Sequence, residues 1–114
     1  MKKKILSFAI SLTLIIALFL TGCVNQGMAD KINEKTKAKG GYTYEQLLKD
    51  YKNPTISAVA PNVGGVVIYI DGCKDKKEAD QKYKNGEEIQ AVYVYVAFNM
   101  VTEAKYTSYN PDKA

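Results

Sequence analysis

The sequence has no histidine, arginine or tryptophan, and it holds only two cysteines and three prolines in 114 residues. Without histidine, a Ser-His-Asp triad, a Cys-His pair and a histidine-built metal site are all excluded. The length allows one small domain and excludes a multidomain enzyme. With 46% hydrophobic and 25% charged residues, the composition is that of a globular chain and not of a disordered or collagen-like one.

The N-terminus has the pattern of an export signal. Three lysines at positions 2–4 precede an uncharged, mostly apolar run from Ile5 to Leu20, and small residues follow at Thr21 and Gly22. A basic segment, a short apolar segment and a small-residue cleavage point are typical of a signal peptide. A bilayer-crossing helix needs about 20 apolar residues, so the sixteen-residue run favours a cleaved signal over residues 1–22.

Leu20, Thr21, Gly22 and Cys23 resemble the lipobox of bacterial lipoproteins. The resemblance implies a thioether-linked diacylglyceryl group on Cys23 and cleavage between Gly22 and Cys23. The alternative is a chance cysteine at the end of an uncleaved anchor. Two or three acyl chains give stable anchoring, whereas one is marginal. We therefore expect a protein held by lipid on the extracytoplasmic face of the cell membrane, with no other cofactor.

The charge is concentrated in the signal. Three of the 16 lysines lie at positions 2–4 and all 12 acids lie beyond residue 23, so the chain after Gly22 has a side-chain charge of +1. Nucleic-acid binding needs a concentrated basic surface, and we expect no nucleic-acid partner. The lysine-rich, arginine-free composition resembles that of low-G+C Gram-positive proteins. In a cell with one membrane, the domain would face outwards.

The second cysteine is expected to be structural or incidental. If Cys23 carries lipid, Cys73 has no partner in its own chain, which excludes a disulfide framework and leaves an intermolecular disulfide as an option. A catalytic thiol needs a base or an electropositive pocket that lowers its pKa. No histidine can serve, and the neighbouring Lys74 is weak support.

Residues 24–41 read as a flexible spacer because they hold three glycines, alternating charges and few large apolar side chains. Residues 42–52 predict a helix, since Tyr44, Leu47, Leu48 and Tyr51 share one helical face. Thr43 and Gln46 have capping-box spacing. Residues 55–65 read as a connection, and residues 75–85 as a second, peripheral helix that begins with acids and ends at Asn85-Gly86.

Alternation predicts strands over residues 66–71 and 89–98 and a returning strand over 101–109, with a turn at Asn99-Met100. Val92, Val94, Val96 and Phe98 are expected on the core face. We therefore predict an α+β domain over residues 42–109, with one or two short helices packed on a three- to four-stranded antiparallel sheet. A helical signal peptide and the flexible spacer (residues 23–41, with lipidated Cys23) precede it, and a polar tail follows at 110–114.

The segment Tyr44-Glu45-Gln46-Leu47-Leu48-Lys49-Asp50-Tyr51-Lys52-Asn53-Pro54-Thr55 resembles a recurring opening of small bacterial lipoproteins. The stretch Val96-Ala97-Phe98-Asn99-Met100-Val101-Thr102-Glu103-Ala104 resembles their last hairpin. Together these resemble the β-lactamase-inhibitor-protein-like and SmpA/OmlA (BamE) superfamily. The resemblance implies two helices on an antiparallel sheet and the binding of other proteins. It transfers no active site.

We expect a non-enzymatic domain that binds a protein or an envelope component. The candidate interaction surface is Tyr69, Tyr93 and Tyr95, since tyrosine is enriched at interfaces. In the alternative, these tyrosines pack under the helix that carries Tyr44 and Tyr51. A small hydrolase or thiol enzyme would have to use Cys73, Asp71, Glu87 or Glu88. A small-ligand or metal-ion binding lipoprotein is the other alternative, although only carboxylates are available and no calcium-loop motif is present.

Overall fold

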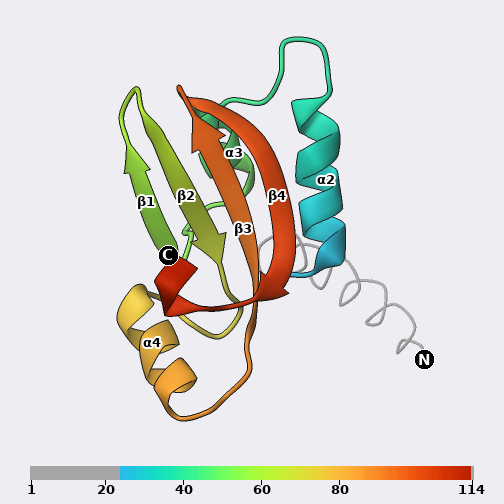
Figure 1. The fold of residues 1–114 in the computed structure, drawn as a ribbon. Helices are drawn as coiled ribbons and strands as arrows, with labels where there is room; N and C mark the ends of the chain where they lie inside the picture. Colours follow the sequence, from blue (N-terminus) through green and yellow to red (C-terminus); the bar gives the residue numbers. More distant parts are fainter. Residues whose placement is uncertain (1–23, 114) are drawn as a thin grey trace, which may run out of the picture.

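The computed structural model describes residues 24–113, which form a four-stranded antiparallel sheet in the order β1-β2-β3-β4 (Figure 1). Three α-helices lie in these described residues, so the predicted α+β class with short helices on an antiparallel sheet is confirmed. The elements, in chain order, are α2 (Gln26–Thr36), α3 (Tyr44–Asp50), β1 (Ile56–Ala60), β2 (Gly64–Tyr69), α4 (Lys76–Lys84), β3 (Gln90–Ala97), β4 (Met100–Ser108) and the 3-10 turn η1 (Pro111–Lys113).

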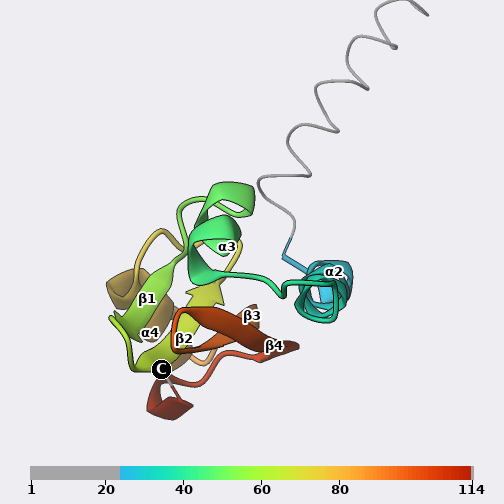
Figure 2. The same ribbon diagram turned by 90° about the horizontal axis from the view of Figure 1, so that it is seen from above.

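Both faces of the sheet are buried over part of their area, because each strand alternates between two apolar sets. One face of β3 carries Val92, Val94 and Val96 and is called the valine face. It packs under α2 and α3, which lie on the same side of the sheet (Figure 2). On the other face, a second cluster reaches α4 and the segment after β4. The first cluster includes Ile32, Leu47, Val67, Val92, Val94 and Val96, and the second includes Ile56, Ile68, Ile70, Ala79, Tyr93 and Tyr109.

The predicted flexible spacer is wrong, because most of residues 24–41 belongs to the folded domain. Asn25 caps α2 by accepting a hydrogen bond from the Met28 amide at 3.0 Å. Met28, Ala29 and Ile32 are buried against the sheet. Three apolar side chains at this spacing form a stripe that is narrow for a helix, but it is wide enough to pack beside one strand. The domain therefore begins about eighteen residues earlier than predicted, at Val24 instead of Tyr42.

Helix α3 confirms the capping-box prediction, although it is shorter than the predicted span. Thr43 Oγ1 accepts from the Gln46 amide at 3.0 Å, and the Gln46 side chain accepts from the Thr43 amide at 3.1 Å. Asp50 joins α3 to α2, because it accepts hydrogen bonds from Lys35 Nζ at 2.8 Å and Tyr42 Oη at 2.7 Å. The lysine, followed by the tyrosine hydroxyl, lowers the pKa of Asp50. The two helices on the valine face are thus tied together.

The predicted connection over residues 55–65 is also wrong, since it contains strand β1. Ala60 accepts from the Val63 amide across a turn in which Pro61 precedes Asn62, whose φ is 64°. Proline followed by a residue with positive φ is typical of a type II turn. A Cβ on Gly65 would collide with the Ala58 carbonyl oxygen, so glycine there lets β1 approach β2. Small, half-exposed residues hid this strand from a hydrophobicity pattern.

The last hairpin turns one residue earlier than predicted. Ala97 pairs with Met100, so Phe98 and Asn99 form the loop, and their φ angles are 50° and 66°. A two-residue loop with positive φ at both positions is a type I′ turn. Phe98 therefore leaves the valine face and is 75% exposed. Helix α4 fits its prediction closely, with Asp75 as N-cap and Asn85 as C-cap.

Candidate binding surfaces

The three tyrosines of the predicted interaction surface do not form one surface. Tyr69 pairs with Val92 across β2 and β3, so it lies on the valine face, while Tyr93 and Tyr95 lie on the opposite face. Tyr69 is 5% exposed and Tyr93 is fully buried. The prediction is therefore wrong for Tyr69 and Tyr93. The relative position of the two strands, which decides this point, is not readable from either strand alone.

The buried tyrosine hydroxyls have partners inside the domain. Tyr69 Oη donates to the Tyr51 carbonyl at 2.7 Å, and the two rings meet edge to face with centroids 6.2 Å apart. Tyr93 Oη accepts from the Asn110 amide at 3.1 Å, and its ring stacks on Tyr95 with centroids 6.5 Å apart. Burial raises the pKa of both Tyr69 and Tyr93. These groups hold the fold together, and the tie to Asn110 brings the start of the predicted tail into the domain.

Cys73 is a buried thiol near the end of the sheet that also holds α4. It is 7% exposed, and burial is the main cause of its raised pKa, which Lys82 opposes only in part. Its carbonyl and that of Ile70 both lie 3.1 Å from the buried Thr55 hydroxyl. A buried thiol with a raised pKa is a poor nucleophile. Glu87 and Glu88, the other candidates for an enzyme, lie exposed in the loop before β3.

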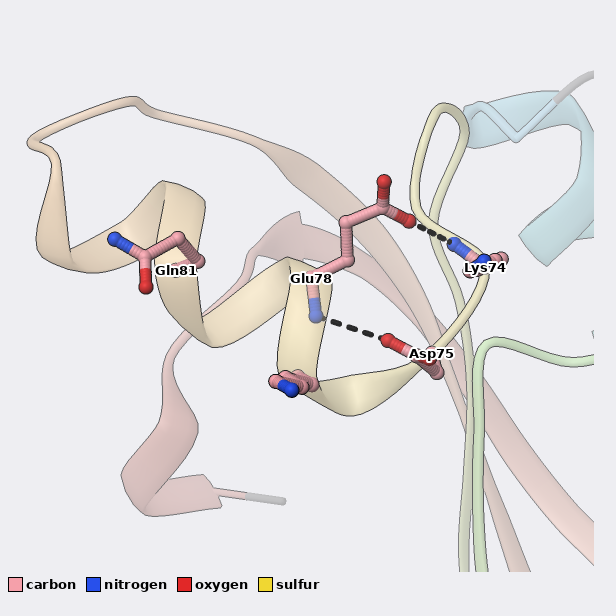
Figure 3. Close-up of a pocket in the computed structure, with 5 residues that line it drawn as sticks. Lys74, Asp75, Glu78 and Gln81 are labelled. Carbon is pink, nitrogen blue, oxygen red and sulfur yellow. Dashed lines mark hydrogen bonds between the residues drawn. The ribbon is translucent and has the colours of Figure 1, made fainter.

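A shallow pocket lies beside the first turn of α4 (Figure 3). The Asp75 carboxylate accepts from the Glu78 amide at 2.9 Å, and the Glu78 carboxylate accepts from the Lys74 amide at 2.8 Å. The Asp75 carboxylate thus caps the helix, and the Glu78 carboxylate holds the amide of the residue just before the cap, so both carboxylates of the pocket already have main-chain partners. The lining residues are Lys74, Asp75, Lys77, Glu78 and Gln81. Within residues 24–113, no group of three histidine, cysteine or acidic side chains is placed to hold a metal ion.

The first described residue is fixed to the domain. The Val24 amide donates to the Asp71 carboxylate at 3.0 Å, and the Val24 side chain packs against the cluster under α2. Asp71 follows β2, so Val24 lies at the end of the sheet where β2 finishes. The predicted lipobox residues Leu20, Thr21, Gly22 and Cys23 lie outside the described residues. Asp71, one of the residues that a small hydrolase would have to use, accepts a main-chain hydrogen bond instead.

The opposite end of the sheet carries the most exposed large apolar side chains of the described residues. Val63 and Phe98, from the two hairpin turns, are 66% and 75% exposed. The Phe98 amide donates to the Val63 carbonyl at 3.2 Å, and Asn99 donates to the Asn62 side chain at 3.1 Å. The two turns therefore form one apolar tip. A shallow recess lined by Thr43, Tyr44, Glu45, Asn99 and Met100 lies beside it.

Sequence reasoning missed this tip. Simple alternation places Phe98 on the valine face, and the predicted connection over residues 55–65 includes Val63. The dipeptide Phe98-Asn99 is a weak turn signal, because phenylalanine rarely adopts a positive φ. The turn residues Pro61-Asn62 were the better signal, and they would have placed Val63 at the end of a hairpin.

No family model, curated protein or solved structure matches the chain. Among the helices of the described residues, none combines the length and the apolar character that a membrane crossing requires.

Proposed function

We propose that the protein is an exported bacterial lipoprotein, anchored through Cys23, whose small domain binds a protein or another envelope component without catalysing a reaction. The observation that carries the proposal is the position of Val24 at one end of the sheet while the apolar tip lies at the other. The lipobox pattern that immediately precedes Val24 supplies the anchor.

The geometry supports an orientation as well as an anchor. Strand β2 begins at Gly64 beside the tip and runs to Tyr69, close to the Asp71 that holds Val24. Six residues of extended chain span about 20 Å. Since Cys23 is joined directly to Val24, acyl chains on Cys23 would hold the Val24 end next to the bilayer. The tip would then face away from the membrane, where an outside partner is accessible.

The chemistry of the tip supports binding. Large apolar side chains at the surface contribute to protein interfaces when they gather in a patch. Phe98 is held at a φ of 50°, a conformation that is uncommon for a bulky residue. Strained positions of this kind are concentrated at functional sites. The positive φ of Phe98 therefore costs free energy, and a role of its side chain in recognition would explain why phenylalanine stands at this turn.

The anchor is tested by acyl labelling of cells that produce the full chain. We expect the wild type to incorporate labelled fatty acid and to be shortened by signal cleavage. Cys23→Ala should lose the label and remain as precursor. Cys73→Ala is the matched control, because it removes the other cysteine and should keep both labelling and cleavage. Continued labelling of Cys23→Ala would refute the proposed anchor.

The binding role of the tip is tested by photocrosslinking in cells. A benzophenone side chain at position 98 should give a discrete protein adduct, because this position is exposed at the end far from Val24. The same group at Lys77, which is exposed on α4, is the control and should not give that adduct. An identical adduct pattern at both positions would contradict a specific role for the tip.

A further inference from the structure

We propose that the outer edge of β1 binds an extended segment of a partner protein, which adds a fifth strand to the sheet. This inference deepens the proposed function and rests on its binding role, but it does not depend on the lipid anchor. The partner segment is uncharged at its centre, with large apolar side chains on one face and small or polar ones on the other.

Strand β1 is an open edge of the sheet (Figure 1). Within the described part of the chain its one strand partner is β2, and no backbone hydrogen bond there joins residues 56–59 to any other element. Ser57 and Ala58 are exposed, and the strand carries no charged residue, proline or bulge. Charges, prolines and bulges are the devices that normally protect edge strands. In β1 all three are missing.

The register identifies which backbone groups point outwards. Val63 lies opposite Phe98 in the register of β2 and β3, and the Phe98 amide donates to the Val63 carbonyl. Position 63 is therefore a hydrogen-bonded pair, and the odd-numbered residues of β2 form the other hydrogen-bonded pairs with β3. Because these pairs alternate along an antiparallel ladder, the even-numbered residues of β2 bond to β1. Their partners in β1 are Ile56, Ala58 and Ala60. Ser57 and Val59 therefore direct their amide and carbonyl groups away from the sheet.

The opposite edge of the sheet is covered near the start and the middle of β4, which makes β1 the less protected edge. The Asn33 side chain of α2 donates to the Ala104 carbonyl at 2.9 Å and accepts from the Ala104 amide at 2.8 Å. The Asn33 side-chain amide therefore makes the two hydrogen bonds with Ala104 that the backbone of a neighbouring strand would make. Near the start of β4, the Val101 amide donates to the Tyr42 carbonyl at 2.8 Å. A bulge and the charged residues Glu103 and Lys105 protect the rest.

The side chains around β1 define the partner segment. Across the sheet from the exposed Ala58 lie Val66 and then Tyr95, so a large apolar side chain placed beside Ala58 would extend this row. On the other face, the Tyr44 hydroxyl lies 3.0 Å from the Ser57 hydroxyl. Because this pair of hydroxyl groups is exposed, we expect a small or polar residue of the partner beside it. Pro54 and Pro61 flank β1 and have no amide hydrogen, so the paired length is about five residues.

A second copy of this chain fits the edge less well than a partner segment. Stable protein interfaces bury about 1,200–2,000 Å² in total, which is more than two five-residue strands of small side chains provide. Antiparallel pairing of two β1 strands would also place the two Val24 ends at opposite ends of the joined sheet. Two proteins anchored upright in one bilayer could not adopt that arrangement. An extended segment of another protein is free of the orientation constraint. Because main-chain hydrogen bonds supply its affinity, it can bind weakly through so small a contact.

The test uses the full chain in detergent micelles and a peptide of seven residues. In this peptide, five alternating valine and threonine residues lie between two terminal lysines. The measurement is amide hydrogen exchange followed by nuclear magnetic resonance. In the free protein the Ser57 and Val59 amides should exchange rapidly. Saturating peptide should slow them about tenfold, as new hydrogen bonds protect amides, and should leave the Ala104 amide unchanged. The same peptide N-methylated on every residue between its ends, which blocks both of its edges, should give no protection.

Variants separate the edge from the fold. Ser57→Pro removes an outward amide but keeps the ladder to β2, and it should weaken peptide binding about two- to tenfold, the effect of losing one hydrogen bond. Ser57→Ala keeps the amide and should bind as the wild type does. Ala58→Lys should also weaken binding, whereas Thr107→Lys on β4 should not. The four variants do not touch Cys23, so acyl labelling should persist in all of them.

Three results would overturn the proposal. The first is equal protection by the N-methylated peptide, and the second is unchanged peptide binding by both Ser57→Pro and Ala58→Lys. The third is a dimer that forms without peptide and that Ser57→Pro abolishes, which would identify a second copy as the occupant. Loss of acyl labelling in the wild type would refute the anchor and would leave the edge assignment standing.

Discussion

The two edges of the sheet differ in how their backbone groups are satisfied. At β4 a side-chain amide from α2 occupies the hydrogen-bonding positions of a missing strand. At β1 the equivalent positions of Ser57 and Val59 meet no other described element. Small domains usually protect both edges, because an exposed edge invites pairing with another chain. The difference indicates that helix α2 has two tasks here, to bury a core and to close one edge.

The largest perturbation of this comparison is to detach α2 from the β4 edge. Ile32 of α2 is fully buried against the sheet. Ile32→Ala should therefore lower the free energy of unfolding by about 2–5 kcal/mol. Urea denaturation followed by circular dichroism would measure the change. Lys31→Ala, one residue earlier and exposed, is the matched control and should change stability by less than about 0.5 kcal/mol. Equal stability of both variants would mean that α2 does not pack on the sheet.

A smaller perturbation opens the β4 edge while α2 stays in place. Asn33→Ala leaves the amide and the carbonyl of Ala104 without their partner, and we expect a loss of about 1–3 kcal/mol. The Ala104 amide should then exchange with solvent as rapidly as those of Ser57 and Val59. Glu34→Ala is the control, since this neighbour is exposed. An Ala104 amide that stays protected in Asn33→Ala would show that something other than Asn33 closes this edge.

The smallest effect comes from the apolar tip, which adjoins both hairpins and leaves both edges intact. Phe98→Asn should raise the free energy of unfolding by about 1 kcal/mol, because asparagine tolerates the positive φ that costs phenylalanine energy. Thermal melting would detect this as a higher midpoint. Val63→Asn removes an equally exposed apolar group, but Val63 has no positive φ, and it should not stabilise the domain. If both variants stabilise equally, the gain comes from lost exposed apolar surface and not from backbone strain.

The parts of the fold with strong local signals were predictable. Helix α3 followed from its capping box and its apolar face, α4 from the Asp75 cap and the Asn85 stop, and β3 from strict alternation. Helix α2 and strand β1 were missed, since each has a weak apolar pattern. Three buried side chains hold α2, and β1 is built mostly of small residues. Both elements are stabilised by the sheet beside them, so their signal lies in tertiary contacts.

The candidate sites were harder to predict than the fold. The predicted lipobox depends only on a local pattern of four residues, which lie outside the described part of the chain, so it stays a prediction. The tyrosine surface failed because it required the register between β2 and β3, which sets Tyr69 opposite Val92. The open edge and the Asn33 contact depend on residues far apart in the chain, Asn33 being 71 positions from Ala104. No local pattern carries such information.

Because Cys73 is buried, the reaction of its thiol with an added reagent would report local opening of the domain. If Cys23 carries lipid, the Cys73 thiol is the sole free one in the chain, and its 7% exposure together with its raised pKa keeps it from reagents while the fold is closed. Its rate of alkylation would therefore measure how often the region around α4 opens. The same alkylation rate could be followed in living cells on the wild-type protein. Binding of a partner at the sheet would slow it about tenfold for each 1.4 kcal/mol by which binding stabilises the closed form.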